Sequence, residues 1–157
     1  MRKLRILLLF IFSIHLAYSS NNLKEIRDFY YKVGLEKVEL EDFEYFLNKK
    51  KKISYPALEG YRAVVWFLKA KDFYNPYRKY EAFVEGKKQL ELLIQKYPSN
   101  IELHFLRLTI QDHLPIFLGY NNQIDTDKKF IKTNLQDLKN DSDLKARIED
   151  YLTGKDK

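Results

Sequence analysis

Three polar residues at helical spacing are the best candidates for chemistry in this chain: His104, Arg107 and Gln111. Positions i, i+3 and i+7 share one face of an α-helix, so these side chains would form a single polar stripe. Apolar residues surround the stripe, and an arginine there needs a partner because an unpaired buried charge is strongly destabilising. We favour a structural ion pair with an acid, either one in the turn next to Glu102 or Asp127 across the following loop. The alternative is that the stripe lines a groove for a ligand or peptide.

Metal binding and covalent catalysis have little support in the sequence. The chain has no cysteine, and His104 and His113 would point to opposite sides of their helix, so no metal site is expected. No serine stands in a Gly-x-Ser-x-Gly turn, and no glycine-rich loop suits a phosphate. We therefore predict no cofactor and no catalytic residue, and we favour a non-enzymatic module over an enzyme of unknown reaction.

Clusters of like charge are typical of solvated surface. Glu81 with Glu85, and Glu39 with Asp42, are pairs of the kind that glycoside hydrolysis uses, but such pairs occur on most charged helices. The lysines at 49–52 would suit an anionic membrane or polymer, and they equally suit the end of a helix, where cations complement the dipole. We favour solvated surface in both cases.

The first twenty residues have the three parts of a secretory signal peptide. A basic start over residues 2–5 precedes an apolar run over 6–16, and residues 17–19 form a small-x-small cleavage site. The run is shorter than the roughly 20 residues of a membrane span, so we favour cleavage after Ser19 over an uncleaved anchor. Because no cysteine follows the run, we do not expect a lipoprotein.

Cleavage would also remove half of the net charge. The whole chain carries 28 Lys+Arg against 22 Asp+Glu, which gives +6. Without the three cations of residues 1–19, the balance is 25 against 22, or +3. So small an excess does not indicate nucleic-acid binding, which needs cations concentrated on one face. We expect residues 20–157 to form one domain, periplasmic or secreted from a bacterium, with an envelope protein or peptide as partner and membrane contact only through the signal peptide.

Capping signals indicate where helices begin and end. A polar residue before an apolar-periodic segment caps its first amide groups, whereas glycine or proline ends a helix. The predicted caps are Asn22, Ser54, Asn75, Asp125 and Asp141, and the predicted ends are at Gly34, Pro115 and Gly154. No segment alternates apolar and polar residues as a half-buried strand would. We therefore predict an all-α protein: an antiparallel helical bundle, or short α-solenoid, of about six helices after the signal peptide.

Three of these helices carry more specific expectations. Residues 54–73 are apolar nearly all round, which predicts a central helix with Trp66 buried. The helix over residues 101–114 has two opposed apolar faces and should contact neighbours on both sides. Gly86 lies within a helix over residues 75–97, where we expect another helix to approach closely. The apolar stripe of that helix is expected to include Tyr80 and Val84.

Part of the chain resembles the second half of a tetratricopeptide repeat, which we interpret as one such hairpin within a helical bundle and not an array of repeats. A helix with Leu90 and Leu93 ends in Pro98-Ser99-Asn100, where the next helix begins at once, and Gly86 stands where the repeat prefers a small residue. Residues 55–135 also resemble an uncharacterised family of small exported bacterial helical proteins. The residues that carry this resemblance include Gly60-Tyr61, Asn75-Pro76, Gly86, Pro98-Ser99-Asn100 and Phe105-Leu106-Arg107-Leu108. The resemblance implies a helical fold and export, and it implies no activity.

Overall fold

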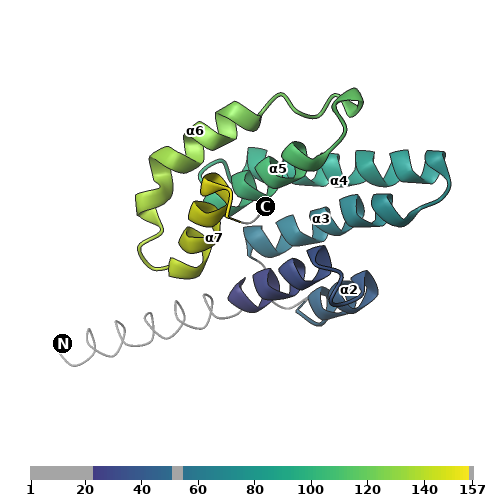
Figure 1. Ribbon diagram of the computed structural model, residues 1–157, viewed down its shortest axis with the longest axis horizontal. Helices are drawn as coiled ribbons and strands as arrows, with labels where there is room; N and C mark the ends of the chain where they lie inside the picture. The colour runs from purple at the N-terminus through teal and green to yellow at the C-terminus, as the bar shows by residue number, and fades with distance from the viewer. Residues whose placement is uncertain (1–22, 51–54, 156–157) are drawn as a thin grey trace.

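The computed structural model describes residues 23–50 and 55–155, and this part of the chain is all-α (Figure 1). A first helix over residues 23–34 is followed by α2 (Leu40–Lys49), α3 (Pro56–Asp72), α4 (Pro76–Lys96), α5 (Ile101–His113), α6 (Ile124–Asn134) and α7 (Ser142–Thr153). Two short 3-10 helices, η1 (Ile116–Leu118) and η2 (Leu135–Asp137), follow α5 and α6. The predicted helical bundle is confirmed, with seven α-helices in the described residues rather than about six. The predicted signal peptide and the caps Asn22 and Ser54 lie outside the described residues.

Local capping chemistry sets several of the observed boundaries. The side chain of Asn75 accepts hydrogen bonds from the first backbone amides of α4, and Asp141 accepts one from Leu144 N at the start of α7. Both predicted caps are therefore confirmed. Gly154 ends α7 in the left-handed conformation, with φ at 74°, as predicted. Each of these signals depends on a few neighbouring residues, so the sequence was enough to find them.

Two details of the predicted helix boundaries are wrong. The first helix ends at residue 34 as predicted, but the left-handed conformation expected at Gly34 belongs to Glu36, whose φ is 55°. The amide of Lys37 bonds to the carbonyl of Lys32 (2.9 Å), which is the Schellman pattern with Glu36 in the position that glycine usually takes. This turn delays α2 to Leu40. Similarly, α6 is capped at Gln123 and not at Asp125, because the Gln123 carbonyl already accepts a bond from the amide of Asp127 (2.8 Å).

An antiparallel hairpin of α3 and α4 forms the long side of the bundle (Figure 1). The close approach expected at Gly86 is present: a Cβ there would lie 2.8 Å from Phe67 Cδ2 and 3.1 Å from the Ala63 carbonyl oxygen of α3. The missing side chain thus allows the two helices to touch through their backbones. Only glycine fits this contact without a shift.

Helix α5 lies between two hydrophobic clusters, as its opposed apolar faces predicted. Leu103, Leu106 and Ile110 pack into the larger cluster with α3, α4 and the first two helices. Ile101 and Leu108 face a smaller cluster formed with Ile131 of α6 and with Leu144 and Ile148 of α7. Helix α5 therefore joins the two halves of the core, and its polar residues are confined between them.

Three side chains are more exposed than predicted. Trp66 is half-buried at the edge of the core, with Lys69 Nζ 5.3 Å from its ring centroid. Tyr80 and Val84 were expected in the core-facing stripe of α4, but they are 58% and 42% exposed. The residues of α4 that are buried are Ala82, Phe83, Gly86, Leu90 and Ile94. The outer side of α4 is therefore more apolar than packing requires.

Candidate functional site

The polar stripe of α5 is buried where this helix meets α4 and α6. His104, Arg107 and Gln111 are all buried, and Asp127 of α6, which faces them, is 0% exposed. Arg107 donates from Nε to Asp127 Oδ2 and from its terminal nitrogen to Oδ1, both at 2.7 Å. Of the two partners that we considered for Arg107, the structure has Asp127. The structure thus brings all three predicted residues together, at an internal junction of helices.

Further hydrogen bonds extend this cluster to α4. The other terminal nitrogen of Arg107 donates to Glu91 Oε2 (2.7 Å), and the hydroxyl of Tyr120 donates to Glu91 Oε1 (2.6 Å). His104 Nδ1 lies 2.7 Å from Asp127 Oδ1, and its Nε2 lies 3.0 Å from the carbonyl oxygen of Pro98. We call His104, Arg107, Asp127, Glu91 and Tyr120 the Arg107 cluster. Its charged groups are held by one another, as buried charges require.

The pKa shifts in this cluster follow from burial and from these bonds. Burial raises the pKa of Asp127, but hydrogen bonds from Arg107 and His104 more than offset this and hold it below its ordinary value. Burial also raises the pKa of Tyr120, and donation to Glu91 raises it further. At neutral pH the carboxylate is therefore charged and the phenol neutral, so the cluster behaves as fixed structure.

Gln111 has one unsatisfied polar atom. Its Oε1 accepts a hydrogen bond from the backbone amide of Gln123 (3.2 Å), which secures the start of α6. Its buried Nε2 has no hydrogen-bond partner within the part of the chain that the structure describes. An unpaired buried donor costs about 1–3 kcal/mol.

A second buried cluster, which the sequence analysis missed, lies on the opposite side of α5. Arg27 is only 2% exposed and makes a two-point ion pair with Glu102, Nε to Oε1 at 2.7 Å and a terminal nitrogen to Oε2 at 2.8 Å. It also bonds to Asp141 (2.7 Å) and Asp143 (3.1 Å) at the start of α7. Tyr61 of α3 donates its hydroxyl to Glu102 Oε1 (2.9 Å). We call Arg27, Glu102, Asp141, Asp143 and Tyr61 the Arg27 cluster.

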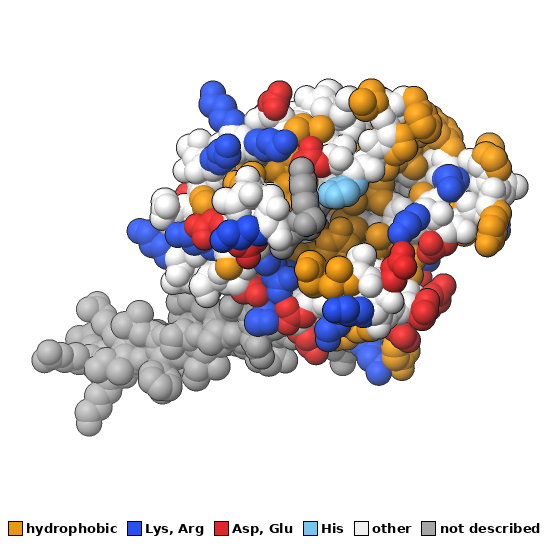
Figure 2. Space-filling view, viewed as in Figure 1, with side chains coloured by type: hydrophobic (Ala, Val, Ile, Leu, Met, Phe, Trp, Pro, Cys, Tyr) orange, Lys and Arg blue, Asp and Glu red, His pale blue; other side chains and the backbone are white. Residues whose placement is uncertain are grey.

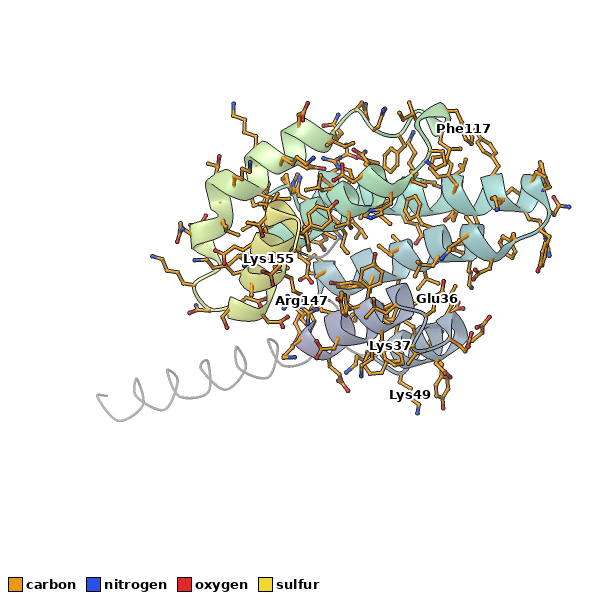
Figure 3. All side chains as sticks on the ribbon, in the orientation of Figure 1. Glu36, Lys37, Lys49, Phe117, Arg147 and Lys155 are labelled. Carbon is orange, nitrogen blue, oxygen red and sulfur yellow. The ribbon has the colours of Figure 1, made fainter. Side chains whose placement is uncertain are left out.

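The sequence contains one signal that points to Arg27. It follows Leu23 by four positions and precedes Tyr30 by three, so it lies on the flank of the apolar stripe of the first helix. Its partners are not visible in the same way, because they come from α5 and α7. At the surface, Arg147 of α7 pairs with Asp143 and with Asp28 of the first helix, which extends the cluster outward (Figure 3).

Large apolar side chains gather on the outside of α4 and on η1. We define the aromatic patch as Tyr74, Tyr77, Tyr80, Val84, Ile116 and Phe117, all of which are exposed. Ile116 and Phe117 are 79% and 86% exposed, and no charged residue occurs from Leu114 to Gln123. Figure 2 shows hydrophobic side chains at η1 and where α3 turns into α4, and Figure 3 shows Phe117 at the edge of the molecule. A surface of this kind is typical of an interaction site.

The remaining sequence candidates lie on the surface. Glu81 is exposed and Glu85 accepts a hydrogen bond from Gln89, while Glu39 and Asp42 are exposed at the start of α2. Of the lysine run, Lys49 lies over the ring of Tyr45 and Lys50 pairs with Glu25 (2.9 Å); residues 51 and 52 lie outside the described residues. His104 and His113 are separated, the first buried and the second exposed. Within the described ranges, no group of three or more His, Asp or Glu is placed to hold a metal ion.

Comparisons of the chain with protein-family models, with curated proteins and with solved structures found no significant match. None of the helices in residues 23–50 and 55–155 is both long and apolar enough to cross a bilayer.

Proposed function

We propose that this chain is an exported, non-enzymatic module of the bacterial cell envelope that binds another protein through the aromatic patch. The observation that carries the proposal is that six large apolar side chains of α4, η1 and the turn before α4 are exposed. Aromatic residues are enriched where proteins bind one another, because they bury much area and lose little conformational freedom. These exposed side chains are not part of the core that we observe. Binding to a partner would explain why apolar residues occupy these positions.

The buried charges support a binding role over a catalytic one. A catalytic group must reach a substrate, usually in a cleft where its pKa is tuned. Arg107, Asp127, Arg27 and Glu102 are instead buried and bonded to one another. These groups stabilise the junctions of α5 with its neighbours. The proposed binding therefore uses exposed side chains of the aromatic patch.

Export and the family resemblance are parts of the same proposal. The proposed signal peptide directs residues 20–157 to the periplasm or the medium, where an envelope protein or peptide is the partner. The successive hairpins of α3 with α4 and α5 with α6 would act as tetratricopeptide-like repeats do, by presenting helix faces to that partner.

Site-specific photo-cross-linking in cells tests the binding role. A photoreactive amino acid replaces Phe117 in one strain and exposed Lys139 in a matched control strain. We expect irradiation to give a discrete cross-linked species with the first and none with the second. No product from either position, or the same products from both, would show that the patch has no specific partner.

Mass spectrometry of the protein recovered from the periplasm or medium tests export. We expect an amino terminus at Ser20, because residues 17 and 19 fit the small subsites of the peptidase. Recovery of the chain only from the membrane fraction with Met1 or Arg2 intact would favour the anchor instead.

A further inference from the structure

Helix α4 has a second apolar row on the side that faces away from the bundle. Tyr77, Tyr80 and Val84 stand at i, i+3 and i+7, so they share one face of the helix, and all three are exposed. Leu92, two turns beyond Val84, is exposed on the same outer side. The buried residues of α4 lie on the opposite face, and Glu91, seven positions after Val84, is bonded to Arg107 and Tyr120. Tyr77, Tyr80, Val84 and Leu92 remain exposed and could pack against another helix.

Two opposite charges beside the row, Glu81 and Lys88, could pair between two copies of this helix. Glu81 and Lys88 are both exposed, lie seven positions apart on one flank of the row, and make no ion pair within the described residues. In two antiparallel copies of one helix, positions with the same sum of residue numbers face each other. The register that places Tyr77 opposite Leu92 also places Glu81 opposite Lys88. Because the two helices are identical, this contact occurs twice in the dimer.

The other flank of the row fits the same arrangement. There Lys87 Nζ lies 4.9 Å from the ring centroid of Tyr120, directly after the loop that exposes Ile116 and Phe117. Tyr120 is itself buried, so this flank is already covered by the same chain, and a second α4 laid along the row would meet opposite charges at the other edge. Val84 lies near the middle of this register, where the symmetry axis would pass.

We propose that two copies of this chain associate through the outer face of α4, with the helices antiparallel about a two-fold axis near Val84. The inference rests on the proposed function, because it names a second copy as the partner of the aromatic patch. A two-fold contact is closed, so it gives a dimer and not a filament. Tyr77, Tyr80 and Val84 form its apolar centre, and the two Glu81–Lys88 pairs fix the direction of the helices.

Charge reversal tests the register. Sedimentation velocity over a range of concentrations is measured for the unaltered protein, for Glu81→Lys, for Lys88→Glu and for the double variant. We expect a dimer for the unaltered protein and a dissociation constant raised at least about tenfold in each single variant, because both symmetric pairs become repulsive. The double variant restores both pairs and should return the dissociation constant to within about threefold. Lys139→Glu, the same charge change on the loop between α6 and α7, should have no effect.

Thermal melting of the same proteins controls for folding. All the altered side chains are exposed, so the melting temperatures should agree closely at a concentration low enough for every variant to be monomeric. A monomer at every concentration, or single variants that dimerise normally, would overturn the proposal. Single variants that are monomeric without rescue by the double variant would also overturn this register.

Cysteine cross-linking gives an independent measurement. The chain has no cysteine, so Val84→Cys introduces a single thiol at the proposed axis. Two thiols that face each other across a two-fold axis can meet the Cα separation of about 4.4–6.8 Å that a disulfide needs. We expect rapid disulfide-linked dimers from Val84→Cys and little from Lys139→Cys at equal concentration. If both remain monomeric while Phe117 cross-links to a different protein, self-association fails and the proposed binding function stands.

Discussion

Arg27 and Glu102 stand 75 positions apart in the chain and meet through two parallel hydrogen bonds of 2.7 and 2.8 Å, almost wholly out of solvent. Because Arg27 also bonds to Asp141, the N-cap of α7, one guanidinium connects the first helix to α5 and to α7. Burial alone would lower the pKa of Arg27, but its carboxylate partners raise it above the ordinary value. This arginine is therefore charged at every pH at which the protein is folded.

Arg27→Ala should lower the free energy of unfolding by about 3–5 kcal/mol, because it leaves buried Glu102 without its cation. Arg147→Ala is the matched control: its ion pairs with Asp143 and Asp28 are partly exposed, so about 1 kcal/mol or less should be lost. Urea unfolding followed by circular dichroism measures both. Equal losses from the two variants would show that burial of the Arg27 cluster has no special weight.

Arg107→Ala should destabilise the protein more than Arg107→Met, since alanine both removes the charge and opens a cavity. Either change leaves Asp127 short of partners, so combining Arg107→Met with Asp127→Asn should cost less than the sum of the two single changes. Melting and partner capture are measured together. If the stripe lines a groove instead, the melting temperatures stay nearly constant while capture is lost, and that result would exclude the structural role.

Acid should destabilise the protein as the pH falls below about 4. The folded pKa of Asp127, Asp143 and Asp28 lies below the ordinary value of 3.8 in each case. A carboxyl whose pKa is depressed by folding stabilises the native state above its unfolded pKa, and this contribution disappears as pH falls through the folded pKa. Urea midpoints between pH 7 and pH 2 measure the effect. Asp127→Asn should flatten the profile, and an unchanged slope would contradict this assignment.

Gly86→Ala should destabilise the protein by about 1–3 kcal/mol, because the added methyl group would overlap the ring of Phe67 and crowd the backbone of α3. Gly34→Ala is the control within the same chain. Nothing lies within 4 Å of a Cβ at Gly34, so alanine there should stabilise by about 0.5–1 kcal/mol through its better helix propensity. Thermal melting of the pair decides the matter, and changes of the same sign would argue against a tight contact between α3 and α4.

The features that could be predicted from the sequence depend on neighbouring residues. Asn75 and Asp141 cap helices through amides two or three positions away, and the two faces of α5 follow from its periodicity alone. The partner of Arg107 was also within reach, since Asp127 lies just beyond the loop that ends α5. These inferences needed only helical geometry and the rule that buried charges pair.

The features that could not be predicted depend on packing between distant segments. Nothing near Arg27 indicates that its acids lie 75 and 114 positions away. The exposure of Tyr80 and Val84 could not be predicted either. The sequence pattern of an apolar residue beside a core-facing stripe is the same whether or not a neighbouring helix covers that residue. Glu36 occupies the position in the turn after the first helix where glycine is usual. The hydrogen bonds of that turn outweigh the modest strain of its left-handed backbone.

The Arg27 cluster also constrains the order of events as the chain folds during its synthesis. Helices near the beginning of the chain cannot bury Arg27 until Glu102 has emerged, and the guanidinium has its full set of partners only once residue 143 is free. Until then, packing the first helix against the bundle would bury the Arg27 guanidinium without its carboxylate partners, which is unfavourable. Completion of the amino-terminal part of the fold is thereby coupled to synthesis of its carboxy-terminal part.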